Sequence, residues 1–296
     1  MKKIIILSFL VLLFPVSLCA KLRVVATYQY IASLVREIGG DLVDVNSLSN
    51  GNIDPHTVVP RPSFIAKASR ADLLIINGAS LDEAWMAPII SQSGNPAIRK
   101  GAAGFLDLSS FVRLRETPVA ISREYGDVHP DGNPHFHLDP FNIPVLARAI
   151  REKLAKLDPK NALLYSEREK TFIGRWKKKN DEWSAVIKSG TIGKIIQYHN
   201  LFNYFFRRYS VENAGFIEPL PGIPPSSKYI AALVKTARAE RVALIIQDVY
   251  HSDEAARYIA RETGARVVVL PHDVGSVKGS EDIFSLFDEI VRRLTK

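Results

Sequence analysis

Histidine is the residue in this sequence best suited to bind a metal, and the positions of its seven histidines matter more than their number. Four of them, His56, His135, His199 and His272, occupy short connections beside predicted strands or helices. Ligands in α/β proteins gather at the carboxyl ends of strands and in the loops that follow. Three or four imidazoles in a tetrahedral array select zinc over manganese or calcium, which prefer more oxygen ligands. These four residues are therefore candidate metal ligands.

The local sequence around three of these histidines is stiff. Each follows a proline, in the runs DPH, NPH and LPH, and proline restricts the backbone of the residue before it. The alternative for any single histidine is that it caps a helix or bonds a carbonyl. Four equivalent positions weaken that alternative without removing it.

The elements that would position these histidines follow a βα rhythm, which is typical of a mainly parallel sheet. Short β-branched runs alternate with helical stretches in the first part of the chain, and the same rhythm restarts near residue 194. The predicted strands are 23–27, 43–47, 73–77, 194–198, 242–247 and 266–270, and the predicted helices are 28–38, 63–69, 82–90, 201–209, 227–239, 253–263 and 282–294. We therefore expect an α/β fold with two lobes, each a mainly parallel sheet flanked by helices.

A long helix is predicted between the lobes. Residues 161–187 contain no glycine or proline except Gly174, and a helix of this length would reach roughly 40 Å. We expect an N-terminal lobe at 21–157, the linking helix at 158–188, a C-terminal lobe at 189–296 and a metal site between the lobes. The span 113–140, rich in Gly, Pro, Asp and His, should be a loop near the lobe boundary.

The first twenty residues predict export. Lys2 and Lys3 precede an apolar run that ends in small residues at Ala20, which is typical of a secretory signal peptide. Cleavage there would remove Cys19, the only cysteine, so the remaining soluble chain would offer no thiolate to a metal. An alternative is that Cys19 is a lipidated N-terminus, but Leu18 is bulky where a lipobox has a small residue.

The charge pattern argues against nucleic-acid binding. The formal charge is +8, but basic residues are scattered among acids, whereas nucleic-acid binding requires them to cluster on one face. The densest basic run, 175–179, has Glu and Asp nearby and is expected to be a solvated helix face.

Several segments together resemble the zinc and manganese solute-binding proteins of ABC importers. The match runs over most of the chain after the signal peptide, and three His-centred motifs occur in the family's order. The segments that carry it are DPHT at 54–57 with Pro60 and Pro62-Ser63, ADL at 71–73 through Gly78 to Trp85, NPH at 133–135 with LDP at 138–140, and His199 with Phe202, Tyr204-Phe205 and Arg208-Tyr209.

The resemblance implies a ligand set and a role. His56, His135 and His199 match the family's first three ligands, and the fourth position falls at His272 or, with a shift of one residue, at Asp273. Manganese-type members tend to have a carboxylate in place of the third histidine, so His199 favours zinc. The implied protein is a periplasmic monomer that delivers Zn²⁺ to the permease of an ABC importer. Through the permease it is coupled to a cytoplasmic ATPase.

Four other polar residues have possible roles at or near the site. His137 stands where the family often has Trp and is a candidate for a residue that supports a ligand or for an alternative ligand. Asp248, at a predicted strand end, is a candidate to provide a further oxygen near the site or to orient an imidazole. His251 is expected to begin a helix. His129 is nearly all that remains of the His-rich loop of some zinc-type members, so we expect no metal-gathering role for this loop.

Three other functions stay open. A carrier of manganese or another divalent metal, or an adhesin, would belong to the same family. A secreted zinc hydrolase would use Asp248 or Glu218 as general base. The chain lacks HExxH and GxSxG motifs, so we expect no enzyme. Because only neutral imidazoles bind metal, affinity should fall as pH drops through about 6.5.

Overall fold

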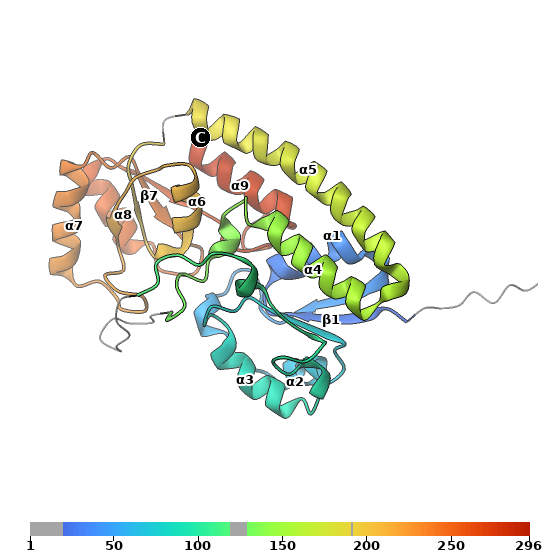
Figure 1. Cartoon of the computed structure of the whole chain (residues 1–296). Helices are drawn as coiled ribbons and strands as arrows, with labels where there is room; N and C mark the ends of the chain where they lie inside the picture. Colours follow the sequence, from blue (N-terminus) through green and yellow to red (C-terminus); the bar gives the residue numbers. More distant parts are fainter. Residues whose placement is uncertain (1–19, 119–128, 191) are drawn as a thin grey trace, which may run out of the picture.

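The computed structural model describes residues 20–118, 129–190 and 192–296. Residues 1–19 of the predicted signal peptide, Cys19 included, lie outside the described residues. Two four-stranded sheets organise the described chain, and every strand pairing within them is parallel. The expected two-lobe α/β fold is confirmed (Figure 1).

The first sheet has the strand order β2-β1-β3-β4. The central strand β3 has the hydrophobic sequence LLII and is buried throughout, as expected for a parallel strand covered on both faces. The elements of this lobe are β1 (Leu22–Ala26), α1 (Gln29–Gly39), β2 (Val43–Ser47), α2 (Pro62–Ala68), β3 (Leu73–Ile76), α3 (Glu83–Gln92), β4 (Phe105–Asp107) and α4 (Ile143–Leu157).

The second sheet repeats this order as β6-β5-β7-β8. Consecutive parallel strands require crossover connections, and helices provide most of them here. The elements are β5 (Ile195–Gln197), α6 (Asn203–Arg208), β6 (Asn213–Phe216), α7 (Ser227–Ala239), β7 (Leu244–Gln247), α8 (Glu254–Thr263), β8 (Arg266–Val269) and α9 (Ile283–Thr295).

The linking helix is present as α5 (Ala162–Ser189), with 28 residues. It runs along one side of the molecule and lies beside α1, α4 and α9 (Figure 1). Trp176 anchors it: the side chain is 1% exposed, and its Nε1 donates to the Pro140 carbonyl at 2.8 Å. Phe284 and Phe287 of α9 pack on the Trp176 ring, with centroids 5.1 and 5.3 Å away.

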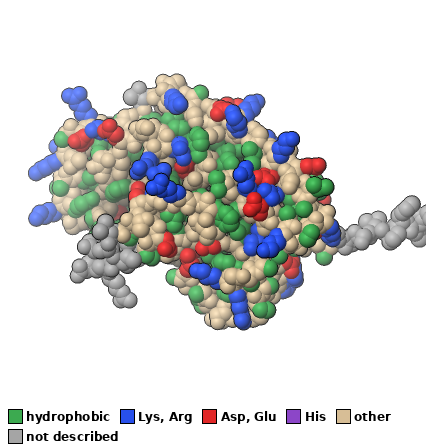
Figure 2. Space-filling view, in the orientation of Figure 1, with side chains coloured by type: hydrophobic (Ala, Val, Ile, Leu, Met, Phe, Trp, Pro, Cys, Tyr) green, Lys and Arg blue, Asp and Glu red, His purple; other side chains and the backbone are tan. Residues whose placement is uncertain are grey.

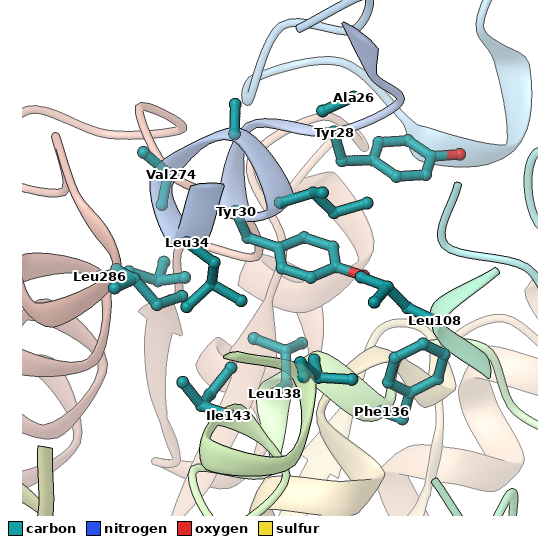
Figure 3. Packing of buried hydrophobic residues seen from close by; sticks show 14 of the residues in the cluster. Ala26, Tyr28, Tyr30, Leu34, Leu108, Phe136, Leu138, Ile143, Val274 and Leu286 are labelled. Carbon is teal, nitrogen blue, oxygen red and sulfur yellow. The ribbon is translucent and has the colours of Figure 1, made fainter. Parts of the chain in front are cut away.

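One hydrophobic cluster is shared by the two halves of the chain, and a second cluster lies within the second half. Buried residues of α1, α4, α5 and α9 form a single cluster with both sheets. Figure 3 shows Val274 and Leu286, which come from the second half of the sequence, beside Leu34 of α1. This shared core holds the lobes in a fixed relation around the boundary where the histidines lie.

Two short strands were not predicted. β4 and β6 have three and four residues, and neither contains a β-branched residue, so no periodicity marks them. The described parts of span 113–140 hold only one short 3₁₀ turn, Phe136–Leu138.

Among the described helices, none has the length and apolar character that would be needed to cross a membrane.

Charged side chains of both signs lie on the face of the molecule that Figure 2 draws. Figure 2 shows Lys and Arg side chains distributed among Asp and Glu over both lobes. Ion pairs account for part of this mixture, such as Arg23 with Asp72 at 2.7 Å and Lys179 with Asp288 at 2.7 Å.

Candidate metal centre

Three histidines converge between the two sheets. One ligand atom from each of His56, His135 and His199 lies within 4.8 Å of the others. The ring centroids are 5.2 Å apart for His56 with His135, 5.2 Å for His56 with His199 and 5.5 Å for His135 with His199. Below, this group is called the triad. A single ion could be bound by all three side chains.

His56 is held by the turn that contains it. The Asp54 side chain caps this turn, because its Oδ1 accepts the backbone N–H of His56 at 2.9 Å. The same oxygen lies 2.8 Å from His56 Nδ1. Pro55 starts the turn, and its carbonyl accepts the Tyr28 hydroxyl at 3.0 Å. Because Nδ1 of His56 is bonded to Asp54, Nε2 is the ring nitrogen left to face His135 and His199.

His199 has an equivalent partner in the second lobe. It follows β5, and its Nδ1 lies 2.6 Å from Oε2 of Glu218, which follows β6. The other carboxylate oxygen of Glu218 accepts the backbone N–H of Gly222 at 2.8 Å. Carboxylates in this position fix the tautomer and orientation of metal-binding histidines.

His135 is the most deeply placed of the three, with no exposed surface. Its backbone N–H donates to the side-chain oxygen of Asn133 at 2.9 Å. The Asn133 amide also donates to the carbonyl of Asn200 at 2.9 Å, next to His199. This contact ties the His135 segment to the His199 segment across the lobe boundary.

The electrostatics favour neutral imidazoles. Burial lowers the pKa of His135 well below its usual value, and the neighbouring histidines lower it further. Burial also lowers the pKa of His199, although Glu218 opposes that shift. Neutral imidazole is the form that binds metal.

The triad also has unsatisfied nitrogen atoms. Nε2 of each triad histidine is buried and has no hydrogen-bond partner within the described residues. Buried polar atoms are rarely left in this state. A divalent cation bound at these nitrogens would satisfy all three, so the residues fit the expected metal.

His272 and Asp273 lie close by but are not members of the triad group. His272 follows β8 and, with His135 and His137, lines a small cavity. Asp273 accepts the backbone N–H groups of Gln29 at 3.1 Å and Tyr30 at 2.7 Å, the first residues of α1. Asp273 thus caps helix α1 of the opposite lobe. Both of its carboxylate oxygens accept hydrogen bonds in this cap.

His137 links the two lobes. Its Nε2 lies 2.9 Å from the carbonyl of His272, and because a carbonyl only accepts, Nε2 must carry the proton. The ring stacks on Tyr30 with centroids 4.2 Å apart. Burial lowers the His137 pKa to about 4. This residue bonds the His272 backbone and lies against helix α1.

Asp248 contacts the imidazole of His251. Its Oδ2 lies 2.9 Å from Nδ1 of His251, and its Oδ1 accepts the backbone N–H groups of Tyr250 and His251 at 3.1 and 2.8 Å. His251 also stacks on Tyr198 at 4.2 Å. Asp248 therefore holds a turn beside the triad and does not orient a triad imidazole.

His129 is a residue that the sequence did not place at the site. Its ring centroid lies 5.3 Å from that of His56 and 6.4 Å from that of His135. Its Nε2 is buried without a partner among the described atoms. Burial, together with His56 and His199, lowers its pKa to about 3. The available signal was only a lone histidine in a loop rich in Gly, Pro and Asp.

Two supporting carboxylates also escaped the sequence analysis. Asp54 was noted only as part of the DPH run, and Glu218 only as a base for a hydrolase. Both prove to be partners of triad histidines.

Comparison with known proteins gives a family match over nearly the whole described chain. The family model described as "Zinc-uptake complex component A periplasmic" (ZnuA) matches residues 24–296. The high-affinity zinc uptake system protein ZnuA of Bacillus subtilis is 26% identical over 266 residues, covering 88% of this chain and 82% of that protein. The manganese ABC transporter substrate-binding lipoprotein PsaA of Streptococcus mitis is 25% identical over 248 residues, covering 82% and 77%.

A solved structure shares the fold. The structure described as "Crystal structure of ZnuA" superposes with a TM-score of 0.77 at 23% identity and covers 93% of this chain and 98% of that one. At this identity the likeness concerns the arrangement of the lobes and the linking helix.

Proposed function

The chain belongs to the ZnuA family of metal-binding solute-binding proteins, and from that premise we propose that it captures Zn²⁺ in the periplasm and delivers it to a membrane permease. Members of this family are the extracytoplasmic, non-enzymatic binding components of ABC importers. The metal is bound as cargo. Its identity, its ligands and the compartment are the parts that we propose here.

One observation carries the choice of zinc: the triad presents three buried nitrogen atoms and no oxygen ligand. Zinc is well suited to imidazole ligands, whereas manganese prefers more oxygen. The carboxylates of Asp54 and Glu218 bond the Nδ1 atoms of His56 and His199. They therefore support the imidazoles and do not replace them.

Capture depends on ligands from both lobes. His56 and His135 come from the first lobe, at 21–157, and His199 from the second, at 189–296. An ion bound to all three ties the lobes together beside α5, the proposed link at 158–188. Release to the permease then requires these ligands to separate. The fourth position has three candidates nearby: His129, His272 and Asp273.

Manganese is the second candidate, because one relative is named for manganese and another for zinc. Calorimetric titration of each metal into metal-free protein distinguishes them. We expect one-to-one zinc binding, with manganese binding much weaker, and loss of zinc binding in His135→Ala. Equal or tighter manganese binding would make the protein a manganese carrier. Absence of saturable zinc binding would contradict the proposal.

A further inference from the structure

We propose that His129 provides the fourth metal ligand, so that the cargo ion is bound by four imidazoles. This inference rests on the proposed function and specifies its site. Neither the sequence motifs nor the family match assigns a role to His129.

The first reason is position. The His129 ring lies as close to His56 as His135 and His199 do, with centroid distances of 5.3, 5.2 and 5.2 Å. Its Nε2 is buried and has no partner among the described residues, like the Nε2 atoms of the triad. His129 is not in the group whose ligand atoms lie within 4.8 Å of one another. Its ring must therefore move slightly toward a bound ion.

The second reason is that His129 begins a well-anchored turn. The carbonyl of His129 accepts the backbone N–H of Gly132 at 3.1 Å. Asp131 within the turn accepts the Ser80 hydroxyl at 3.1 Å. Gly132 has φ +116°, and a side chain there would place Cβ only 2.6 Å from the Arg115 carbonyl. The turn that carries His129 is thus held by Ser80, which bonds Asp131, and by the close approach of Gly132 to the Arg115 carbonyl.

The residue after this turn joins both lobes. Asn133 donates its backbone N–H to the Arg115 carbonyl at 2.7 Å, and its own carbonyl accepts the Tyr204 hydroxyl of α6 at 2.8 Å. Its side chain donates to the Asn200 carbonyl at 2.9 Å. The turn that carries His129 is therefore fixed to the second lobe as well as the first.

The other candidates are less well placed. The Asp273 carboxylate is bonded to backbone N–H groups at the start of α1. His272 lies in the cavity with His137, and its ring packs edge-on against Tyr250 at 5.0 Å. Its Nδ1 also lacks a partner within the described chain, so His272 is the competitor that an experiment must separate from His129.

Zinc affinity provides the first test. We would measure it by competition with a chromophoric chelator for the parent chain and for His129→Ala, His272→Ala and His251→Ala. Loss of a residue that supports a zinc ligand typically weakens binding 10–100-fold, so loss of a ligand in His129→Ala should weaken it by at least about 100-fold. His251 bonds Asp248 outside the triad, so His251→Ala should bind zinc as the parent does.

A spectroscopic signature separates ligation from a structural effect. In His129→Cys, prepared from residue 21 onward so that Cys19 is absent and then loaded with Co²⁺, a thiolate bound to the metal gives a near-ultraviolet charge-transfer band that the equally prepared parent lacks. We expect this band at one equivalent of cobalt. Its absence would overturn the proposal, because a residue that only packs over the triad cannot produce it.

The outcomes separate the two proposals. If the parent chain does not bind zinc, the proposed function fails. If the parent binds zinc and His129→Ala binds it equally well, only the assignment of His129 fails. A large loss in His272→Ala together with no loss in His129→Ala would give the fourth position to His272.

Discussion

Nδ1 of His199 lies 2.6 Å from Oε2 of Glu218, and both side chains are buried at the lobe boundary. Because Nδ1 donates to this carboxylate, the lone pair on Nε2 points toward His56 and His135. His56 has the same relation to Asp54, at 2.8 Å. Each lobe thus contributes a triad histidine whose orientation is set by an acid beside it.

Replacing that acid should weaken metal binding while the triad remains. In Glu218→Gln the charge that favours the Nδ1–H tautomer is lost, and zinc affinity should fall by about 10–100-fold. Competition titration measures the change. The control is Glu212→Gln, which removes a largely exposed partner of Lys194 near β6. Equal affinity in the two variants would show that Glu218 does not support the site.

Asp273 should contribute to stability more than to metal binding. Asp273→Ala leaves the N–H groups of Gln29 and Tyr30 without an acceptor, which should cost about 1–3 kcal/mol in the free energy of unfolding. Urea unfolding of metal-free protein measures this loss. Asp181→Ala, an exposed position on α5, should change stability by no more than about 0.5 kcal/mol. A stable Asp273→Ala protein with abolished zinc binding would instead make Asp273 a ligand.

The linking helix should be fixed by Trp176. Trp176→Ala removes a fully buried ring and should lower the free energy of unfolding by about 3–5 kcal/mol. Val186→Ala is the matched control, because Val186 lies on the same helix but is 44% exposed. Denaturant unfolding compares the two variants. Similar losses in both would contradict a shared core between α5 and α9.

The pH range in which zinc affinity falls should lie lower than it would for ordinary imidazoles. Metal displaces protons from imidazoles, so affinity falls as pH falls. Burial lowers the pKa of His135 and His199, so these two rings carry fewer protons at a given pH than ordinary imidazoles do. The fall in affinity should therefore extend below the ordinary range near 6.5 that the sequence alone indicated.

Calorimetry in buffers of different ionisation enthalpy counts the released protons. Three histidines with an ordinary pKa of 6.5 would release about 2.3 protons at pH 6. We expect fewer than about two, because burial lowers the pKa of His135 and of His199. Release of two or more protons would show that the triad is protonated before zinc arrives.

Much of the fold followed from sequence because the longer strands are β-branched and the helices keep their periodicity. The predicted strand 43–47 and helix 227–239 match the observed β2 and α7. β6, with the sequence NAGF, escaped because its pairing with β5 depends on tertiary contacts rather than on its own residues.

The triad was predictable because each of its histidines follows a strand or a proline in a motif. His129 was not, because its position over the triad depends on Gly132 and on contacts of Asp131 with Ser80, which no spacing in the sequence reveals. The capping role of Asp273 likewise joins residues 243 positions apart in the chain, at Tyr30.

The most direct test of the account is a crystal structure of the zinc-loaded protein with anomalous diffraction at the zinc edge. We predict one strong peak between the lobes, about 2.0–2.1 Å from Nε2 of His56, Nε2 of His199 and one ring nitrogen of His135. A zinc peak located away from these three atoms, for example beside His251 and Asp248, would contradict the central claim.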